Sequence, residues 1–138
     1  MIKVVIADDE QRICRLIQAL IDWEAYGMQV AGIASNGLEA LELLQQEMPD
    51  ILITDIRMPG CNGLELISKA REIVADIRMI IISGYAQFEY AQTAMKYGVS
   101  EYLLKPINQQ ELQDTLSRLR EDIMLEKREK TQNYIQGN

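Results

Sequence analysis

Short apolar runs alternate along the chain with segments whose apolar residues recur at spacings of three and four. Runs rich in β-branched residues are typical of strands buried in a parallel sheet. The three-and-four spacing is typical of amphipathic helices that cover such a sheet. The pattern predicts five strands, at residues 3–7, 29–33, 51–54, 79–83 and 101–104.

Five helices are predicted between and after these strands. Their apolar stripes are formed by Ile13, Leu16, Ile17, Leu20 and Ile21; Leu38, Leu41 and Leu44; Leu64, Ile67 and Ala70; Phe88, Ala91 and Met95; and Leu112, Leu116, Leu119 and Ile123. Strict alternation of strands and helices, with both sheet faces apolar, predicts a three-layer α/β fold with right-handed crossovers.

Turn and cap residues support the predicted boundaries. Three helix starts carry an Asn followed three residues later by a Glu, as in a capping box. Gly98 is expected to end the fourth helix in the left-handed conformation. The three pairs are Asn36 with Glu39, Asn62 with Glu65, and Asn108 with Glu111.

Length and composition indicate one ordinary globular domain. The chain has 138 residues, of which 48% are hydrophobic and 25% charged. No apolar stretch approaches the roughly 18 residues of a membrane-spanning helix, and the first residues lack the pattern of a secretory signal. We therefore expect a cytoplasmic protein without a membrane partner.

Charge and histidine content exclude several functions. The net charge of −7 repels phosphate backbones, so this chain alone is not expected to bind nucleic acid. The absence of histidine excludes histidine bases, histidine-ligated metals and an internal phosphohistidine. Any chemistry must use carboxylates, hydroxyls or lysine.

Polar residues follow four of the five predicted strands. Asp8 and Asp9 follow the first strand, Asp55 the third, Ser83 and Gly84 end the fourth, and Lys105 and Pro106 follow the fifth. In an open parallel sheet, ligands bind beyond the carboxyl ends of the strands, where these residues would meet. Each alone has an ordinary structural explanation, such as a helix cap or an exposed turn.

Together these residues indicate a phosphoryl site. Three converging carboxylates repel one another unless a cation lies among them, and hard oxygen ligands select Mg²⁺. A nearby lysine, a hydroxyl and backbone amides complete a pocket for a phosphoryl group. Two chemistries fit: an aspartate that accepts a phosphoryl group, or metal-assisted hydrolysis of a phosphate ester. The chain has no glycine-rich nucleotide motif.

Four ordered motifs carry a family resemblance, and they are VVIADDE at 4–10, ILITDIRMPGCNGLEL at 51–66, MIIISGYAQFEYA at 79–91 and GVSEYLLKPI at 98–107. From about Ile2 to Leu119 the chain resembles the receiver domain of two-component response regulators. The resemblance implies a flavodoxin-like (βα)5 fold with sheet order 2-1-3-4-5. It also implies a phosphoacceptor switch that catalyses only its own phosphorylation and dephosphorylation, and is not otherwise an enzyme.

The resemblance assigns a role to each candidate residue. It implies that Asp55 is the phosphoacceptor, and that Asp8, Asp9, Asp55 and the Arg57 backbone carbonyl hold Mg²⁺. It further implies that Lys105, Ser83 and Gly84 bind the phosphoryl group. Ser83 and Tyr102 are implied to form a switch pair, and the bond between Lys105 and Pro106 to be cis. The side chain of Arg57 is expected either to lie over the phosphoryl group or to extend into water.

The resemblance also implies domain organisation and partners. Residues 1–122 are expected to form the receiver domain, and 123–138 a helical extension or the start of a linker to an output domain. The motifs are most similar to receivers fused to AraC-type helix-turn-helix regulators. The implied partners are a sensor histidine kinase, a second copy through the fourth helix, fifth strand and fifth helix, and DNA through an output domain outside this chain. The alternatives are a stand-alone phosphorelay receiver and a small Mg²⁺-dependent phosphohydrolase.

Overall fold

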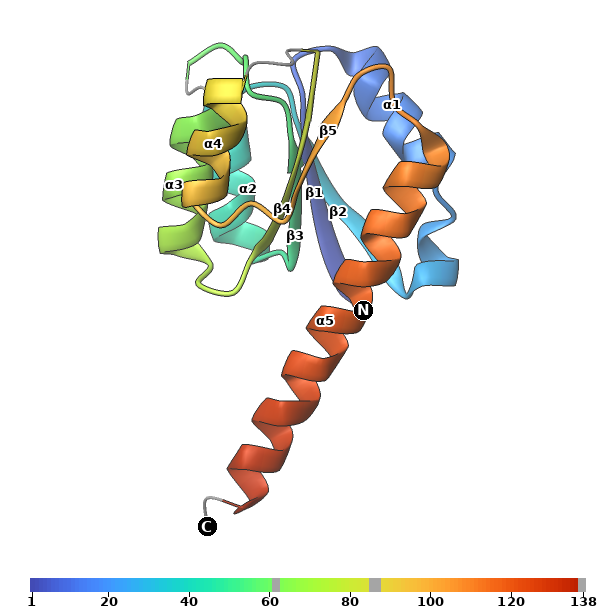
Figure 1. Ribbon diagram of the computed structural model, residues 1–138, viewed down its shortest axis with the longest axis vertical. Helices are drawn as coiled ribbons and strands as arrows, with labels where there is room; N and C mark the ends of the chain where they lie inside the picture. Colours follow the sequence, from blue (N-terminus) through green and yellow to red (C-terminus); the bar gives the residue numbers. More distant parts are fainter. Residues whose placement is uncertain (61–62, 85–87, 137–138) are drawn as a thin grey trace.

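The computed structural model describes residues 1–60, 63–84 and 88–136 (Figure 1). Strands and helices alternate from the first residues onward, as the hydrophobic pattern predicts. The elements are β1 (Ile2–Ala7), α1 (Gln11–Leu20), the 3₁₀ helix η1 (Trp23–Tyr26), β2 (Met28–Ala34), α2 (Gly37–Glu47), β3 (Ile51–Thr54), α3 (Gly63–Ile73), β4 (Arg78–Ser83), α4 (Phe88–Lys96), β5 (Glu101–Leu104) and α5 (Gln109–Gln136).

The five strands form one parallel sheet in the order β2-β1-β3-β4-β5. The central register pairs Ile6 of β1 with Ile53 of β3, and Ile53 with Ile80 of β4. The chain order therefore reverses between β1 and β3, which makes the carboxyl ends of these two strands the switch point where α/β sheets bind ligands. The flavodoxin-like α/β fold and its strand order are confirmed.

Helices cover both faces of the sheet (Figure 1). Alternate residues of each strand point to opposite faces, so neighbours in β1 such as Val5 and Ile6 belong to different layers of the core. One face packs against α2, α3 and α4 through Ala40, Leu44, Leu66, Ile67, Ala70 and Ala94. The other face packs against α1 and α5 through Cys14, Ile17, Leu112, Leu116, Leu119 and Ile123.

Two of the three predicted caps are present as hydrogen bonds. The Asn36 side chain accepts from the Glu39 amide at 2.9 Å, and Asn108 accepts from the Glu111 amide at 2.9 Å. The third pair begins at Asn62, which lies outside the described residues. Gly98 follows α4 with φ of 80°, so its predicted role as a helix stop is confirmed.

Three apolar residues of the predicted helix stripes are exposed instead of buried. Leu16, Leu38 and Met95 retain 41%, 63% and 54% of their accessible surface. Each helix buries only the narrow strip that faces the sheet, so apolar residues at the margin of a stripe remain in water. The pattern identifies the helices correctly but overestimates how much of each is core.

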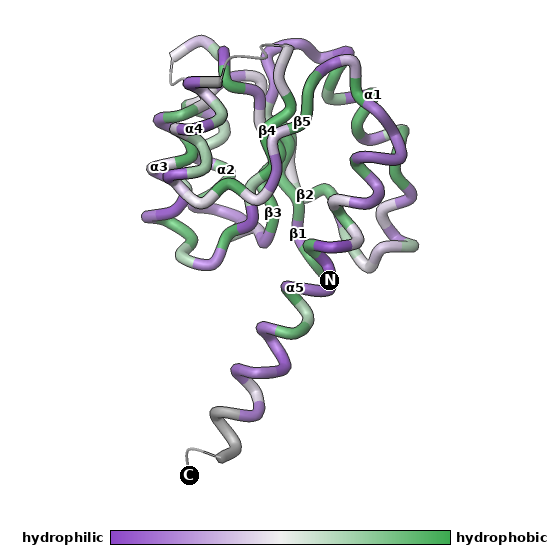
Figure 2. The backbone as a smooth tube through the Cα atoms, in the orientation of Figure 1, coloured by the Kyte–Doolittle hydropathy of each residue, from purple (hydrophilic) through white to green (hydrophobic). Residues whose placement is uncertain are grey.

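Helix α5 continues well past the core (Figures 1 and 2). Among its described side chains, which extend to residue 132, the last buried one is Ile123. The helix is continuous across position 122, so the expected change from domain to extension falls inside one element. No helix in the described part of the chain combines the length and apolar character needed to cross a membrane.

Candidate functional site

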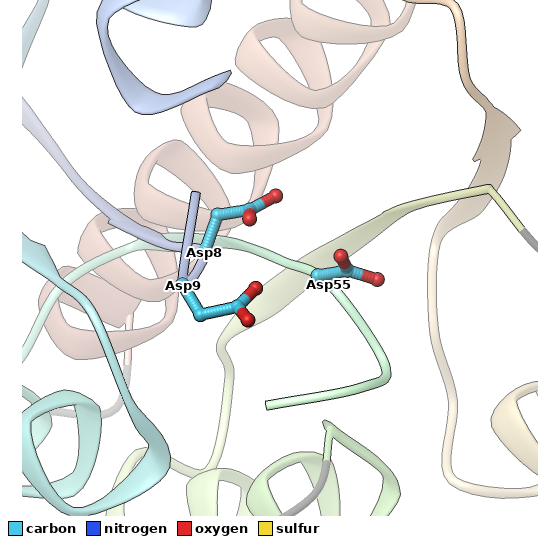
Figure 3. A group of neighbouring side chains, drawn as sticks. All are labelled: Asp8, Asp9 and Asp55. Carbon is cyan, nitrogen blue, oxygen red and sulfur yellow. The ribbon is translucent and has the colours of Figure 1, made fainter. Parts of the chain in front are cut away.

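The candidate site lies at the carboxyl ends of β1, β3 and β5. Asp8 follows β1, Asp55 follows β3 and Lys105 follows β5. Strands β1 and β3 are neighbours in the sheet. Parallel pairing brings these strand ends to one edge, as the sequence predicts. Figure 3 shows the side chains of Asp8, Asp9 and Asp55 gathered there.

The three carboxylates are close enough to share a cation. One oxygen from each of Asp8, Asp9 and Asp55 lies within 4.8 Å of the others. Asp8 and Asp55 are buried, with 2% and 6% of their surface exposed, whereas Asp9 is exposed. One carboxylate therefore faces solvent while two are enclosed.

Backbone groups fix both buried carboxylates. Asp8 Oδ1 accepts from the Glu10 amide at 2.9 Å, at the start of α1. Asp55 Oδ1 accepts from the Ile56 amide at 2.6 Å, and the Asp55 amide donates to the Ala7 carbonyl at 3.1 Å. Asp55 is thereby attached to β1 as well as to its own turn, and its second oxygen, Oδ2, faces Lys105.

The ammonium of Lys105 lies among these carboxylates. Its Nζ is 2.9 Å from Asp55 Oδ2 and 3.2 Å from Asp8 Oδ2. Burial disfavours this ammonium, but the hydrogen bond and charge of Asp55, together with Asp8, outweigh it and raise the pKa of Lys105. Burial raises the pKa of Asp8, partly offset by the Glu10 amide and by Lys105. Lys105 is therefore a permanent cation of the site at neutral pH.

The charge balance and donor set fit Mg²⁺. When all three aspartates are ionised, Lys105 compensates one charge and leaves two uncompensated. A divalent cation would neutralise these two. Opposite ligands of an octahedral Mg²⁺ are about 4 Å apart, close to the spread of these oxygens, and Mg²⁺ prefers oxygen ligands. Asp8, Asp9 and Asp55 are the residues that would hold it.

Gly63 determines how closely the chain after β3 can approach the site. A Cβ at this position would collide with the carbonyl oxygen of Asp55 and with the backbone of Ile56. The Gly63 amide also donates to the Ile56 carbonyl. Only glycine allows the start of α3 to lie against the turn that carries Asp55.

The remaining predicted residues lie around this centre. Ser83 is fully buried at the end of β4, and its carbonyl accepts from the Lys105 amide at 2.8 Å. Tyr102 on β5 is half-buried. Burial raises the pKa of Tyr102, and a hydrogen bond with Ser83 offsets part of this rise. Gly84 and Arg57 are exposed. The proposed roles of these residues stay predictions.

The peptide bond between Lys105 and Pro106 is cis.

One contact of the site was missed from the sequence. Glu10 Oε1 lies 3.9 Å from Lys105 Nζ, and the Glu10 side chain is half exposed. A third acidic residue directly after Asp8 and Asp9 was the available signal.

A flavodoxin-like α/β domain with an acidic, lysine-bridged site at its switch point is the class that fold and site define. The chain belongs to the response regulator receiver domain family, because the sequence model of this family matches residues 4–117. The resemblance predicted from the four sequence motifs is therefore confirmed.

Relatives agree with this assignment. The chain is 45% identical over 119 residues to the uncharacterized transcriptional regulatory protein YesN of Bacillus subtilis, covering 86% of this chain and 32% of YesN. It is 41% identical over 119 residues to the transcriptional regulatory protein HptR of Staphylococcus aureus, covering 86% of this chain and 46% of HptR. The chain thus spans less than half of these curated relatives.

Solved structures show the same fold. The REC domain of AraT, a response regulator from Geobacillus stearothermophilus, superposes with a TM-score of 0.86 at 42% identity, covering 91% of this chain and 97% of that one. A CheY-like receiver domain protein from Methanospirillum hungatei superposes with a TM-score of 0.83 at 25% identity, covering 91% and 98%.

Proposed function

We propose that this chain accepts a phosphoryl group on Asp55 from a sensor histidine kinase, with Mg²⁺ as cofactor, and thereby switches an output domain. The observation that carries the proposal is the arrangement of Asp55 Oδ2 against Lys105 Nζ, at 2.9 Å, beside Asp8 and Asp9. A carboxylate nucleophile, an acidic metal site and a fixed cation are the parts that phosphoryl transfer to aspartate requires.

In the proposed reaction, Asp55 Oδ2 attacks the phosphorus of the donor phosphohistidine in line with the leaving nitrogen. The new P–O bond forms an acyl phosphate while the P–N bond breaks and its electron pair returns to the donor imidazole. Bound Mg²⁺ supplies charge neutralisation at the phosphoryl oxygens. Lys105 neutralises a further oxygen, and the backbone of Arg57 and Gly84 is proposed to complete the metal and phosphoryl contacts.

Ser83 and Tyr102 are proposed to report the phosphoryl group to the surface. The Ser83 hydroxyl lies at the end of β4, next to β5, and shares a hydrogen bond with Tyr102. If Ser83 turns toward the phosphoryl group, Tyr102 loses this partner and can move inward. The exposed apolar residues Met95 on α4 and Leu104 on β5 support a protein-binding face on α4, β5 and α5.

The output is proposed to be transcription. The names of YesN and HptR describe transcriptional regulatory proteins that are longer than this chain. We propose residues 1–122 as the receiver, 123–138 as an extension toward an AraC-type DNA-binding domain outside this chain, and a homodimer through α4, β5 and α5. A cytoplasmic location is part of the same proposal.

The test is phosphorylation by a small donor. Incubation with acetyl phosphate and Mg²⁺ should add one phosphoryl group, measured by intact mass, and omission of Mg²⁺ should prevent it. Mg²⁺ alone should raise the melting temperature, and Asp9→Asn should weaken this effect. Thermal melting suits this test better than Trp23 fluorescence, because Trp23 follows α1 whereas Asp8 and Asp9 precede it.

The rival functions give different results. A phosphohydrolase would turn over a phosphate ester many times, whereas a receiver takes up one group per chain. A stand-alone phosphorelay protein would take up the group without any effect on transcription in the full-length protein. Failure of Mg²⁺-dependent uptake in the wild type would overturn the proposed function.

A further inference from the structure

The stretch of α5 beyond the core is attached to the domain by charged side chains. Arg78 Nη2 lies 2.6 Å from Glu126 Oε2, and Lys130 Nζ lies 2.6 Å from Asp76 Oδ2. Lys127 Nζ lies 3.8 Å from Asp50 Oδ1. We call this set of six residues, from the turn before β3, the region where β4 begins and α5, the α5 anchor.

Hydrogen bonds within the domain hold Asp50 and Arg78 in place. Asp50 Oδ2 accepts from the Lys3 amide at 2.9 Å, which ties it to β1. Arg78 Nη1 donates to the Asp76 carbonyl at 2.7 Å while Nη2 donates to Glu126. Lys130 lies between Asp76 and Glu126, 3.4 Å from the latter, so the main pairs form one connected network.

Apolar packing does not hold this part of the helix. Within the part of α5 whose side chains are described, Ile123 is the last buried residue, and those from 124 to 132 are all at least partly exposed. A cleft of about 310 Å³ lies between the helix and the turns that carry Asp50 and Asp76. An isolated helix as short as residues 124–132, in which five of the nine residues are charged, is marginal in water without tertiary contacts.

We infer that the α5 anchor is an electrostatic latch that holds the α5 extension helical and in a fixed direction relative to the sheet. Three ion pairs between α5 and the domain, two of them linked through Lys130 and Glu126, replace the apolar contacts that end at Ile123. Such a latch weakens when salt screens the charges, because Asp76, Lys127 and Lys130 are exposed, although the pair of Arg78 and Glu126 is partly buried. Its use in transmitting a signal to an output domain rests on the proposed function, whereas the latch itself does not.

Amide exchange on the full chain tests the latch. In wild-type protein, amides between 124 and 132 should exchange about fivefold or more slowly at about 0.05 M salt than at about 1 M salt. Arg78→Gln and Asp76→Asn should give fast exchange in this segment at low salt. The charge swap of Arg78→Glu with Glu126→Arg should restore slow exchange. Arg118→Gln is the matched control, because it breaks an α5 ion pair, with Glu101, outside the anchor.

The direction of the α5 extension relative to the sheet is measured separately from its helix formation. Spin labels at the exposed positions Gln46 and Gln132, in a background without Cys14 and Cys61, should give a narrow distance distribution in the wild type. Arg78→Gln should broaden it. Fast exchange in the wild type at low salt, or variants with wild-type exchange and an unchanged distance distribution, would overturn the latch. Asp55 phosphorylation should be normal in Arg78→Gln, so failure of the proposed function is recognised independently.

Discussion

The ammonium of Lys105 lies 2.9 Å from Asp55, 3.2 Å from Asp8 and 3.9 Å from Glu10. One cation thus partly neutralises a group of carboxylates that would otherwise repel one another. Its hydrogen bond to Asp55 Oδ2 also orients the oxygen that the proposed reaction uses. Lys105 and a divalent cation therefore act on the same charges.

Lys105→Ala separates these two contributions. The substitution removes a phosphoryl contact but no metal ligand, so phosphorylation by acetyl phosphate should slow at least about tenfold. Mg²⁺ should still raise the melting temperature, and by more than in the wild type, because no ammonium competes for the carboxylates. Lys3→Ala, which breaks the ion pair with Glu47, is the control. A wild-type phosphorylation rate in Lys105→Ala would contradict the assigned role.

Gly63→Ala tests the close approach behind Asp55. The new Cβ would collide with backbone atoms, which cannot move aside as a flexible side chain can, so unfolding should become easier by about 1–3 kcal/mol. Chemical denaturation measures the change. Gly84→Ala is the matched control, since a Cβ there meets nothing within 4 Å. Equal stability of the two variants would show that the approach is not tight.

At the scale of elements, Arg71 joins the ends of two helices. Its guanidinium donates to the carbonyls of Ala75 and Ile77, which follow α3, at 3.2 and 2.9 Å. It also donates to those of Tyr97 and Gly98, which follow α4, at 3.5 and 2.9 Å. One cation therefore satisfies carbonyls near two helix C-termini, where positive charge is favoured.

Arg71→Ala should lower the free energy of unfolding by about 1–3 kcal/mol, because it leaves the partly buried Ile77 carbonyl, and three exposed carbonyls, without their donor. Urea denaturation measures this loss. Arg118→Ala, which removes an exposed partner of Glu101, should change stability by no more than about 0.5 kcal/mol. A loss in Arg71→Ala no larger than in Arg118→Ala would refute the joining role.

The sequence predicted the bounds of two strands accurately but gave no sign of the short 3₁₀ helix. The bounds of β3 and β5 agree with the prediction, because a short apolar run between turn signals leaves little freedom. The 3₁₀ helix η1 was not predicted, since four residues are too few to show a periodicity. It forms where Trp23 and Tyr26 pack against the α1 and α5 side of the core.

The candidate site was predictable because strand ends in a parallel sheet converge. Asp8, Asp9, Asp55 and Lys105 were identified from position alone, before any geometry. The α5 anchor was not predictable, because its partners are between 48 and 77 residues apart in sequence and look like ordinary surface charges. Pairing of exposed charges depends on the tertiary fold.

At the scale of the whole molecule, the chain has a net charge of −7, and one helix, α5, projects from the domain (Figure 2). The hydrogen bond and charge of Lys130 lower the pKa of Asp76 below its ordinary 3.8, and the same contact raises the pKa of Lys130. Asp76 therefore stabilises the folded chain above pH 3.8, and this stabilisation is lost as pH falls through its lowered pKa.

Acid should therefore release the α5 extension. As the pH falls below about 4, amides between 124 and 132 should lose protection, because protonated Asp76 no longer pairs with Lys130. In Asp76→Asn the same amides should exchange fast already at neutral pH, without this acid step. Hydrogen exchange across a pH series, corrected for intrinsic rates, measures the effect. An acid step of equal size in Asp76→Asn would assign it to another group.

The central claim is that Asp55 alone receives the phosphoryl group. Borohydride reduces an aspartyl phosphate to homoserine, so tandem mass spectrometry can locate the modified position after treatment with acetyl phosphate. We predict conversion at Asp55, dependent on Mg²⁺ and absent from Asp55→Asn, with Asp8 and Asp9 unchanged. Conversion at Asp8 or Asp9, or uptake that persists in Asp55→Asn, would contradict it.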